Sequence, residues 1–113
     1  SSFGTQLWQP VANLPAGSYR LTVPVQLHWQ ENLDPNDPTW DSYTAESGAW
    51  ILVNGQKLGQ WVNARQMGDR TWTDHVVEFT LDAPADVEVL LRFKSKYAHK
   101  DFFIDFVRLE KID

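Results

Sequence analysis

Six tryptophans stand among the 113 residues of this chain, together with six phenylalanines and three tyrosines. A core of this size does not easily enclose so many large rings, so we expect one to three of them to be exposed as stacking surfaces. Trp40 and Trp61 lie in or beside the long irregular segments Glu31–Gly48 and Asn63–Trp72, and Tyr97 follows a predicted strand. These three residues are the candidate platforms, while packing in the core is the simpler explanation for most other rings.

Polar side chains alternate with apolar ones in two predicted strands. Gln26 and His28 occupy the polar positions of one strand, and Arg92 and Lys94 those of another. If the two strands adjoin, their outward faces form a groove whose amide, imidazole and guanidinium groups suit sugar hydroxyls, and whose cations suit uronic acid carboxylates. A solvated sheet face is the commoner explanation for any one of these residues, but the nearby aromatic residues favour the groove.

Carboxylates appear in two further places. Asp105 shares its parity with Phe103, Val107 and Leu109, and a carboxylate on a core-facing parity must be paired, hydrogen-bonded or bound to a metal. Pairing with a buried arginine and capping of backbone amides remain open beside the metal. The acidic loop Asn32–Asp41 lacks the spacing of an EF-hand, so turns are the favoured explanation, with a sugar-binding lip at Trp40 as the alternative.

Several classes of function are disfavoured by composition and motifs. The net charge of −5 and the pI near 5.0 argue against nucleic acid, and no apolar run approaches the ~20 residues of a membrane helix. Cysteine is absent, the three histidines lack metal-ligand spacing, and no nucleophile elbow or phosphate-binding loop is present. We therefore expect a protein that is not an enzyme and does not insert into a membrane.

Strict alternation of apolar and polar residues must position these side chains. The segment Tyr19–Gln30 reads as one long half-buried strand, in which Pro24 indicates an edge or a bulge and Trp29 shares the core parity. Further strands are predicted at Ala49–Val53, Lys57–Val62, Asp74–Leu81, Val87–Phe93 and Phe102–Leu109, with an Asn54-Gly55 hairpin turn after the first of them. No helical pattern exceeds ten residues. The chain is therefore predicted to be a single all-β domain, an antiparallel two-sheet sandwich.

Four segments of the chain match motifs that belong to one family of domains. Leu14–Leu21 is similar to an entry strand "L-x-A-G-x-Y-x-L", and Trp72 with Val77–Thr80 is similar to a "W-x-x-x-x-x-x-F-T" segment. Phe103–Leu109 resembles a closing strand "F-Y-I-D-D-V-x-L", with Phe106 in place of its second aspartate, and Ala98–Asp101 resembles a "K-H-N-D" loop. With these motifs the sequence resembles the jelly-roll carbohydrate-binding modules of bacterial glycoside hydrolases and extracellular proteins.

This resemblance implies a jelly roll in which Trp72, Phe79, Val107 and Leu109 pack between the sheets. It also implies that Asp105 contributes to a structural calcium site at one edge of the sandwich, since calcium takes six to eight oxygen ligands.

Two hypotheses about function follow. The favoured one is a non-catalytic module of a secreted or cell-surface protein that binds a polysaccharide or oligosaccharide through Trp40, Trp61, Tyr97, Gln26, His28, Arg92 and Lys94. The alternative is a structural spacer or assembly domain whose aromatic residues pack against a neighbour. In both cases we expect residues 1–113 to be excised from a larger extracellular protein with neighbouring domains.

Overall fold

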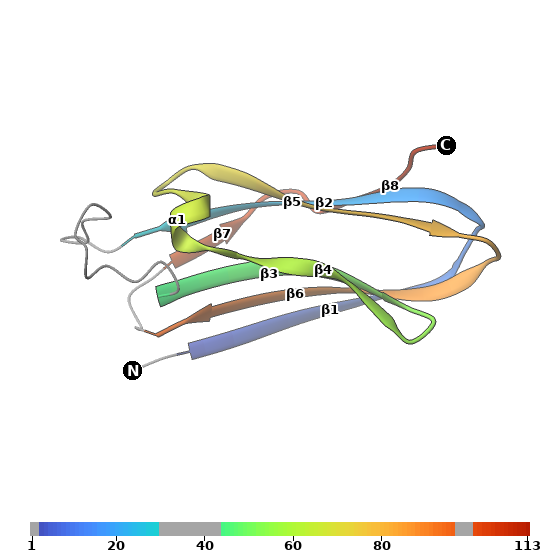
Figure 1. Cartoon of the computed structure of the whole chain (residues 1–113), viewed down its shortest axis with the longest axis horizontal. Coiled ribbons are helices and arrows are strands. Elements are labelled where there is room, and N and C mark those ends of the chain that lie inside the picture. Colours follow the sequence, from blue (N-terminus) through green and yellow to red (C-terminus); the bar gives the residue numbers. More distant parts are fainter. Residues whose placement is uncertain (1–2, 30–43, 97–100) are drawn as a thin grey trace.

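Two antiparallel β-sheets stack as the layers of a sandwich in the computed structural model, which describes residues 3–29, 44–96 and 101–113 (Figure 1). The strands are β1 (Phe3–Leu14), β2 (Gly17–His28), β3 (Ala45–Val53), β4 (Gln56–Asn63), β5 (Trp72–Leu81), β6 (Ala85–Ser95), β7 (Asp101–Ile104) and β8 (Arg108–Lys111). The short helix α1 (Ala64–Met67) follows β4 and is capped by Asn63. Within the described ranges, no helix is long and apolar enough to cross a membrane.

Each sheet contains four strands. The first sheet has the order β1-β6-β3-β4, and the second has the order β5-β2-β7 with β8 also paired to β2. In Figure 1 the second sheet forms the upper layer and the first sheet the lower layer. This arrangement confirms the predicted all-β, two-sheet architecture.

The predicted hairpin lies between β3 and β4. Asn54 and Gly55 both have positive φ angles, of 49° and 76°, as the favoured two-residue hairpin turn requires. Val53 and Gln56 pair on either side of this turn, which fixes the register of the two strands up to the pair Glu46 and Asn63. The hairpin is therefore confirmed, and β3 begins four residues earlier than alternation predicts.

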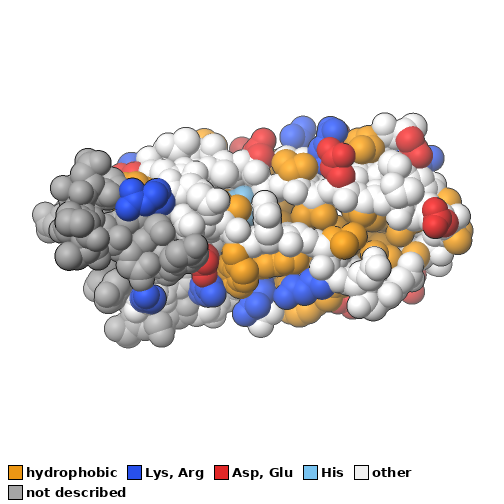
Figure 2. All heavy atoms as spheres, in the orientation of Figure 1, with side chains coloured by type: hydrophobic (Ala, Val, Ile, Leu, Met, Phe, Trp, Pro, Cys, Tyr) orange, Lys and Arg blue, Asp and Glu red, His pale blue; other side chains and the backbone are white. Residues whose placement is uncertain are grey.

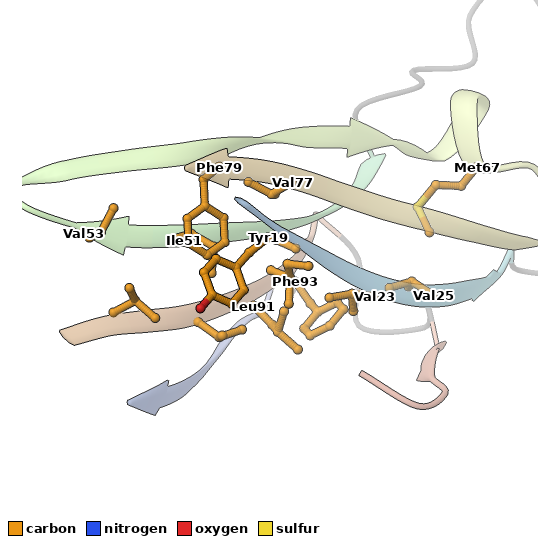
Figure 3. Packing of buried hydrophobic residues seen from close by; sticks show 14 of the residues in the cluster. Tyr19, Val23, Val25, Ile51, Val53, Met67, Val77, Phe79, Leu91 and Phe93 are labelled. Carbon is orange, nitrogen blue, oxygen red and sulfur yellow. The ribbon is translucent and has the colours of Figure 1, made fainter. Parts of the chain in front are cut away.

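The core lies between the sheets, along the seam where Figure 2 shows hydrophobic side chains. Alternate residues of β2, β3, β5 and β6 point into it, among them Val23 and Val25 of β2, Ile51 of β3 and Leu91 of β6 (Figure 3). Tyr19 stacks on Phe79 across the β2–β5 pair, with ring centroids 5.5 Å apart. The Tyr19 hydroxyl donates a hydrogen bond of 2.7 Å to the Pro15 carbonyl, so this ring is buried without an unpaired polar group.

Strand β1 is the element that alternation did not predict. It pairs with β6 from Phe3 and Ser95 to Leu14 and Ala85, and it forms one edge of the first sheet. Residues 4–10 are all exposed, so this part of the strand has no buried face and shows no alternation of apolar and polar residues that would predict it.

The predicted closing strand is interrupted in the structure. Ile104 pairs with Val25 and Arg108 pairs with Thr22, so three residues of the closing segment lie opposite two residues of β2. The extra residue is the signature of a bulge, and it lies opposite Pro24, whose nitrogen cannot donate to a neighbouring strand. Because a bulge shifts the alternation by one residue, it separates β7 from β8 and reverses which side chains face inward.

Candidate functional site

The two polar rows that were expected to form one groove lie on opposite outer faces of the sandwich. β2, which carries Gln26 and His28, pairs with β5, β7 and β8, whereas β6, which carries Arg92 and Lys94, pairs with β1 and β3. The prediction that these two strands adjoin is therefore wrong, because alternation within a strand does not specify its partner.

Trp61, Arg92 and Lys94 do come together, on the outer face of the first sheet. One row across this face joins Trp61, Gly48, Arg92 and Gln6, and the next row joins Gly59, Trp50, Leu90 and Trp8. We define the tryptophan surface as the larger side chains of these rows with the adjacent lysine: Trp8, Trp50, Trp61, Leu90, Arg92 and Lys94. Trp40 and Tyr97, the other two predicted platforms, lie outside the described residues.

Two glycines make room for Trp50 on this face. A Cβ atom at Gly48 would lie 2.7 Å from Cζ3 of Trp50, and one at Gly59 would lie 2.6 Å from Cδ1 of the same ring. The indole therefore lies close against the sheet over both glycines. As a result Trp50 is only 4% exposed although it faces outward, and Leu90 beside it is 2% exposed.

Cationic side chains surround the rings of Trp50 and Trp61, which meet edge to face with centroids 4.9 Å apart. The Lys94 ammonium lies 4.5 Å and the Arg92 guanidinium 5.0 Å from the Trp61 ring centroid, and Lys57 lies 4.9 Å from that of Trp50. Figure 2 shows several Lys and Arg side chains along the layer that contains the first sheet. Each cation–π contact at an exposed site contributes roughly 0.5–1 kcal/mol, so the cations are held near the rings.

Glu46 fixes the position of Lys94. Its carboxylate lies 2.8 Å from the Lys94 ammonium, and the Glu46 side chain is only 10% exposed. Lys94 thus contacts both a carboxylate and an indole, while Arg92 contacts the same indole from the neighbouring row. The guanidinium of Arg92 carries N–H donors of the kind that bind an anionic or hydroxylated ligand.

The half-exposed Trp8 completes this surface and was not among the sequence candidates. It is 51% exposed, more than any other described tryptophan, and it lies across β6 from Trp50. Its placement depends on the pairing of β1 with β6, which is more than seventy residues away in sequence, so alternation carried no signal for it.

The outer face of the second sheet holds the other predicted polar residues. Gln26 pairs with Trp72 on one side and Phe103 on the other, and the ring centroids of His28 and Phe103 are 4.5 Å apart.

The expectation that Trp72 packs between the sheets is wrong. Trp72 is 48% exposed, because the inward-facing residues of β5, such as His75, lie on the opposite parity. Phe79 and Leu109, by contrast, contact the core as expected.

The prediction that Asp105 lies on a core-facing position is also wrong. Asp105 is exposed, as are Phe103 and Val107, because the bulge places Phe102 and Ile104 against the core instead. The Asp105 amide donates a hydrogen bond of 3.1 Å to the Pro24 carbonyl. Among residues 3–29, 44–96 and 101–113, no group of three His, Cys, Asp or Glu side chains could hold a metal ion. Calcium binding at Asp105 therefore stays a prediction from resemblance.

Comparisons of the chain with protein-family models, with curated proteins and with solved structures found no match.

Proposed function

We propose that this chain is a non-catalytic carbohydrate-binding module that holds an acidic polysaccharide on the tryptophan surface. The observation that carries the proposal is the placement of two accessible tryptophans, Trp8 and Trp61, on one face with Arg92 and Lys94 between them. Neither a metal nor a nucleophile is required for this role, since binding depends on stacking, hydrogen bonds and charge.

The chemistry of the surface matches that of a chain of acidic sugars. Apolar faces of sugar rings pack on indoles, while carboxylates pair with Arg92, whose planar fork accommodates them bidentately. Trp8 and Trp61 are three strand spacings and two residues along the strand apart, which is about 16 Å between their backbones. A ligand that contacts both rings therefore has to be longer than a single sugar.

The tryptophan surface carries local positive charge although the protein as a whole is acidic. The whole chain carries a net charge of −5, and Lys94 is already paired with Glu46, so the attraction of an acidic polysaccharide has to come mainly from Arg92 rather than from the overall field. Interactions of exposed charges are screened by salt over about 10 Å at 0.1 M. Binding is therefore expected to weaken as salt is raised.

Affinity electrophoresis through gels that contain polygalacturonate, alginate or neutral polysaccharides tests the proposal. An acidic polysaccharide should retard the wild type, and Trp61→Ala or Trp8→Ala should weaken binding about thirtyfold, as the loss of a central aromatic contact costs roughly 2 kcal/mol. Arg92→Ala should weaken acidic binding, and its effect should shrink at high salt.

Arg108→Ala is the matched control, because it removes the same charge from the outer face of the second sheet. Thermal unfolding of each variant separates lost binding from lost folding. The proposal is overturned if no acidic polysaccharide retards the wild type, or if Arg92→Ala and Arg108→Ala behave alike.

A second candidate function is a structural domain that packs against a neighbour. An opening of about 360 Å³ between β1 and β8 is lined mainly by apolar side chains, including Leu7, Val107 and Leu109. Leu7, Phe106 and Val107 are exposed near it, and such a patch is typical of an interface. This function is favoured if the electrophoresis shows no retardation with any polysaccharide.

A further inference from the structure

The outer face of the second sheet holds a second aromatic cluster, far from the tryptophan surface. Trp72 and Phe103 are 48% and 45% exposed, and they lie on either side of Gln26 as its partners in the β2–β5 and β2–β7 pairs. Their backbones are two strand spacings apart, about 10 Å. His28 lies beside Phe103, so one polar ring and two apolar rings share a small area.

Hydrogen bonds fix the orientation of the Gln26 amide. Its Nε2 donates to the Arg70 carbonyl at 3.1 Å, and a carbonyl can only accept, so the amide oxygen Oε1 must face His28. That oxygen lies 2.7 Å from Nε2 of His28 and can only accept in turn. In the neutral ring, Nε2 therefore carries the hydrogen, and Nδ1 is left as an acceptor.

Asp69 and Arg70, which lie beside the Gln26 amide, are themselves hydrogen-bonded to the end of β2. The Arg70 amide donates to the Leu27 carbonyl at 2.9 Å, and the Asp69 carboxylate accepts from the Trp29 amide at 2.8 Å. The arrangement of donors and acceptors is thus set before any ligand binds, which reduces the ordering cost of binding.

Charge distinguishes this face from the tryptophan surface. The guanidinium of Arg70 forms an ion pair of 2.6 Å with Asp69, which largely neutralises it. Asp74, Asp101 and Asp105 are exposed nearby, since Asp74 and Asp105 flank Pro24 and Asp101 pairs with His28. Among the described residues around this cluster the charge balance is negative, which disfavours an acidic ligand.

We infer that Trp72, Phe103, Gln26 and His28 form a second carbohydrate-binding site, which takes neutral sugars. Trp72 and Phe103 contact the sugar rings, His28 accepts a hydrogen bond from a hydroxyl, and Gln26 positions His28. This inference shares with the proposed function the role of carbohydrate binding, but it depends on a different face of the molecule. Because the two faces point in opposite directions, a module with both sites binds two polysaccharide chains at once.

Affinity electrophoresis with hydroxyethylcellulose, galactomannan and mixed-linkage β-glucan tests the second site. At least one of these neutral polysaccharides should retard the wild type, and Trp72→Ala and Phe103→Ala should each weaken that binding at least tenfold. Val76→Ala is the matched control, because Val76 is a half-exposed apolar residue on the same face of β5. Trp61→Ala should leave neutral binding unchanged.

Gln26→Ala provides a readout that does not depend on the choice of sugar. A long-range ¹H–¹⁵N spectrum of the wild type should show His28 with its hydrogen on Nε2, and the variant should show a changed tautomer balance at His28.

The second site is overturned if none of the three polysaccharides retards the wild type. It is also overturned if neutral binding is lost in Trp61→Ala and retained in Trp72→Ala. A wild type that binds neutral but not acidic polysaccharides would instead reject the proposed function, so the two failures can be distinguished.

Discussion

Trp50 is an outward-facing residue that is buried because two neighbouring residues lack side chains. Gly48 and Gly59 lie directly beneath its indole, and the Trp61 ring packs against its edge. The tryptophan surface therefore depends on residues that contact no ligand. A glycine whose only role is to leave space does not change hydrophobic alternation, so alternation alone does not predict that Trp50 is buried on an outward face.

Gly48→Ala should destabilise the protein and disturb this surface. The new Cβ would lie 2.7 Å from both Cζ3 of Trp50 and the Gln60 carbonyl oxygen, so the indole has to move. Overpacking of this kind typically costs 1–3 kcal/mol, which lowers the Tm by several degrees in a domain of about 100 residues. Gly4→Ala is the control, because its Cβ would meet nothing closer than 3.9 Å on the same face of the sheet. Equal melting temperatures for the two variants would contradict the role of Gly48.

Strand β1 is the element most open to pairing with another chain. Its twelve residues carry no charge, and within the described ranges no strand pairs with its other edge. Natural edge strands usually carry lysine, proline or a bulge against self-association, and here only Pro10 and the irregularity after Val11 serve this purpose.

Gln9→Lys should slow aggregation of concentrated protein, as measured by light scattering. Gln9 is exposed, so the free energy of unfolding should change by less than about 0.5 kcal/mol. The added lysine reduces the net charge from −5 to −4, which by itself favours aggregation, so any protection must come from its place on the edge. Ala83→Lys makes the same charge change in an exposed turn. If Ala83→Lys protects equally well, the edge of β1 is not responsible.

The stability of the whole molecule is linked to pH through His75, which lies between the sheets. Its Nε2 is 2.6 Å from Oγ of Ser47, and both residues are buried. Burial lowers the pKa of His75 below its ordinary value, and the backbone and carboxylate of Asp74 offset part of this effect. The folded protein therefore holds His75 neutral at a pH where the unfolded chain binds a proton.

The free energy of unfolding should fall as the pH drops below about 6.5, the ordinary pKa of histidine, because only the unfolded state gains the proton there. Above that pH the contribution of His75 is constant. His75→Gln removes this titration, so the variant lacks this loss of stability at low pH. The free energy of unfolding of the wild type minus that of the variant, measured in urea, should therefore fall from pH 7 to pH 5, by at most about 1.4 kcal/mol per pH unit. A difference that stays constant over this range would show that His75 does not titrate on unfolding.

Much of the fold follows from local patterns along the chain. Alternation located the core faces of β2, β5 and β6, and Asn54-Gly55 located the hairpin, because side-chain period and turn conformation depend on neighbouring residues. The closing segment was misassigned for the opposite reason. A bulge opposite Pro24 reverses which side chains face inward after Ile104, and the sequence of the segment itself does not predict that reversal.

The sequence by itself determined that this protein is an all-β sandwich with more aromatic rings than its core needs. Only the tertiary structure decided which of those rings and polar groups meet. Trp61, Arg92 and Lys94 share one face with Trp8, whereas Gln26 and His28 lie on the opposite face with Trp72 and Phe103. The packing of the whole core determines which strands pair, and it brings together residues as far apart in sequence as Phe3 and Ser95. The alternation within a single strand does not specify its partner.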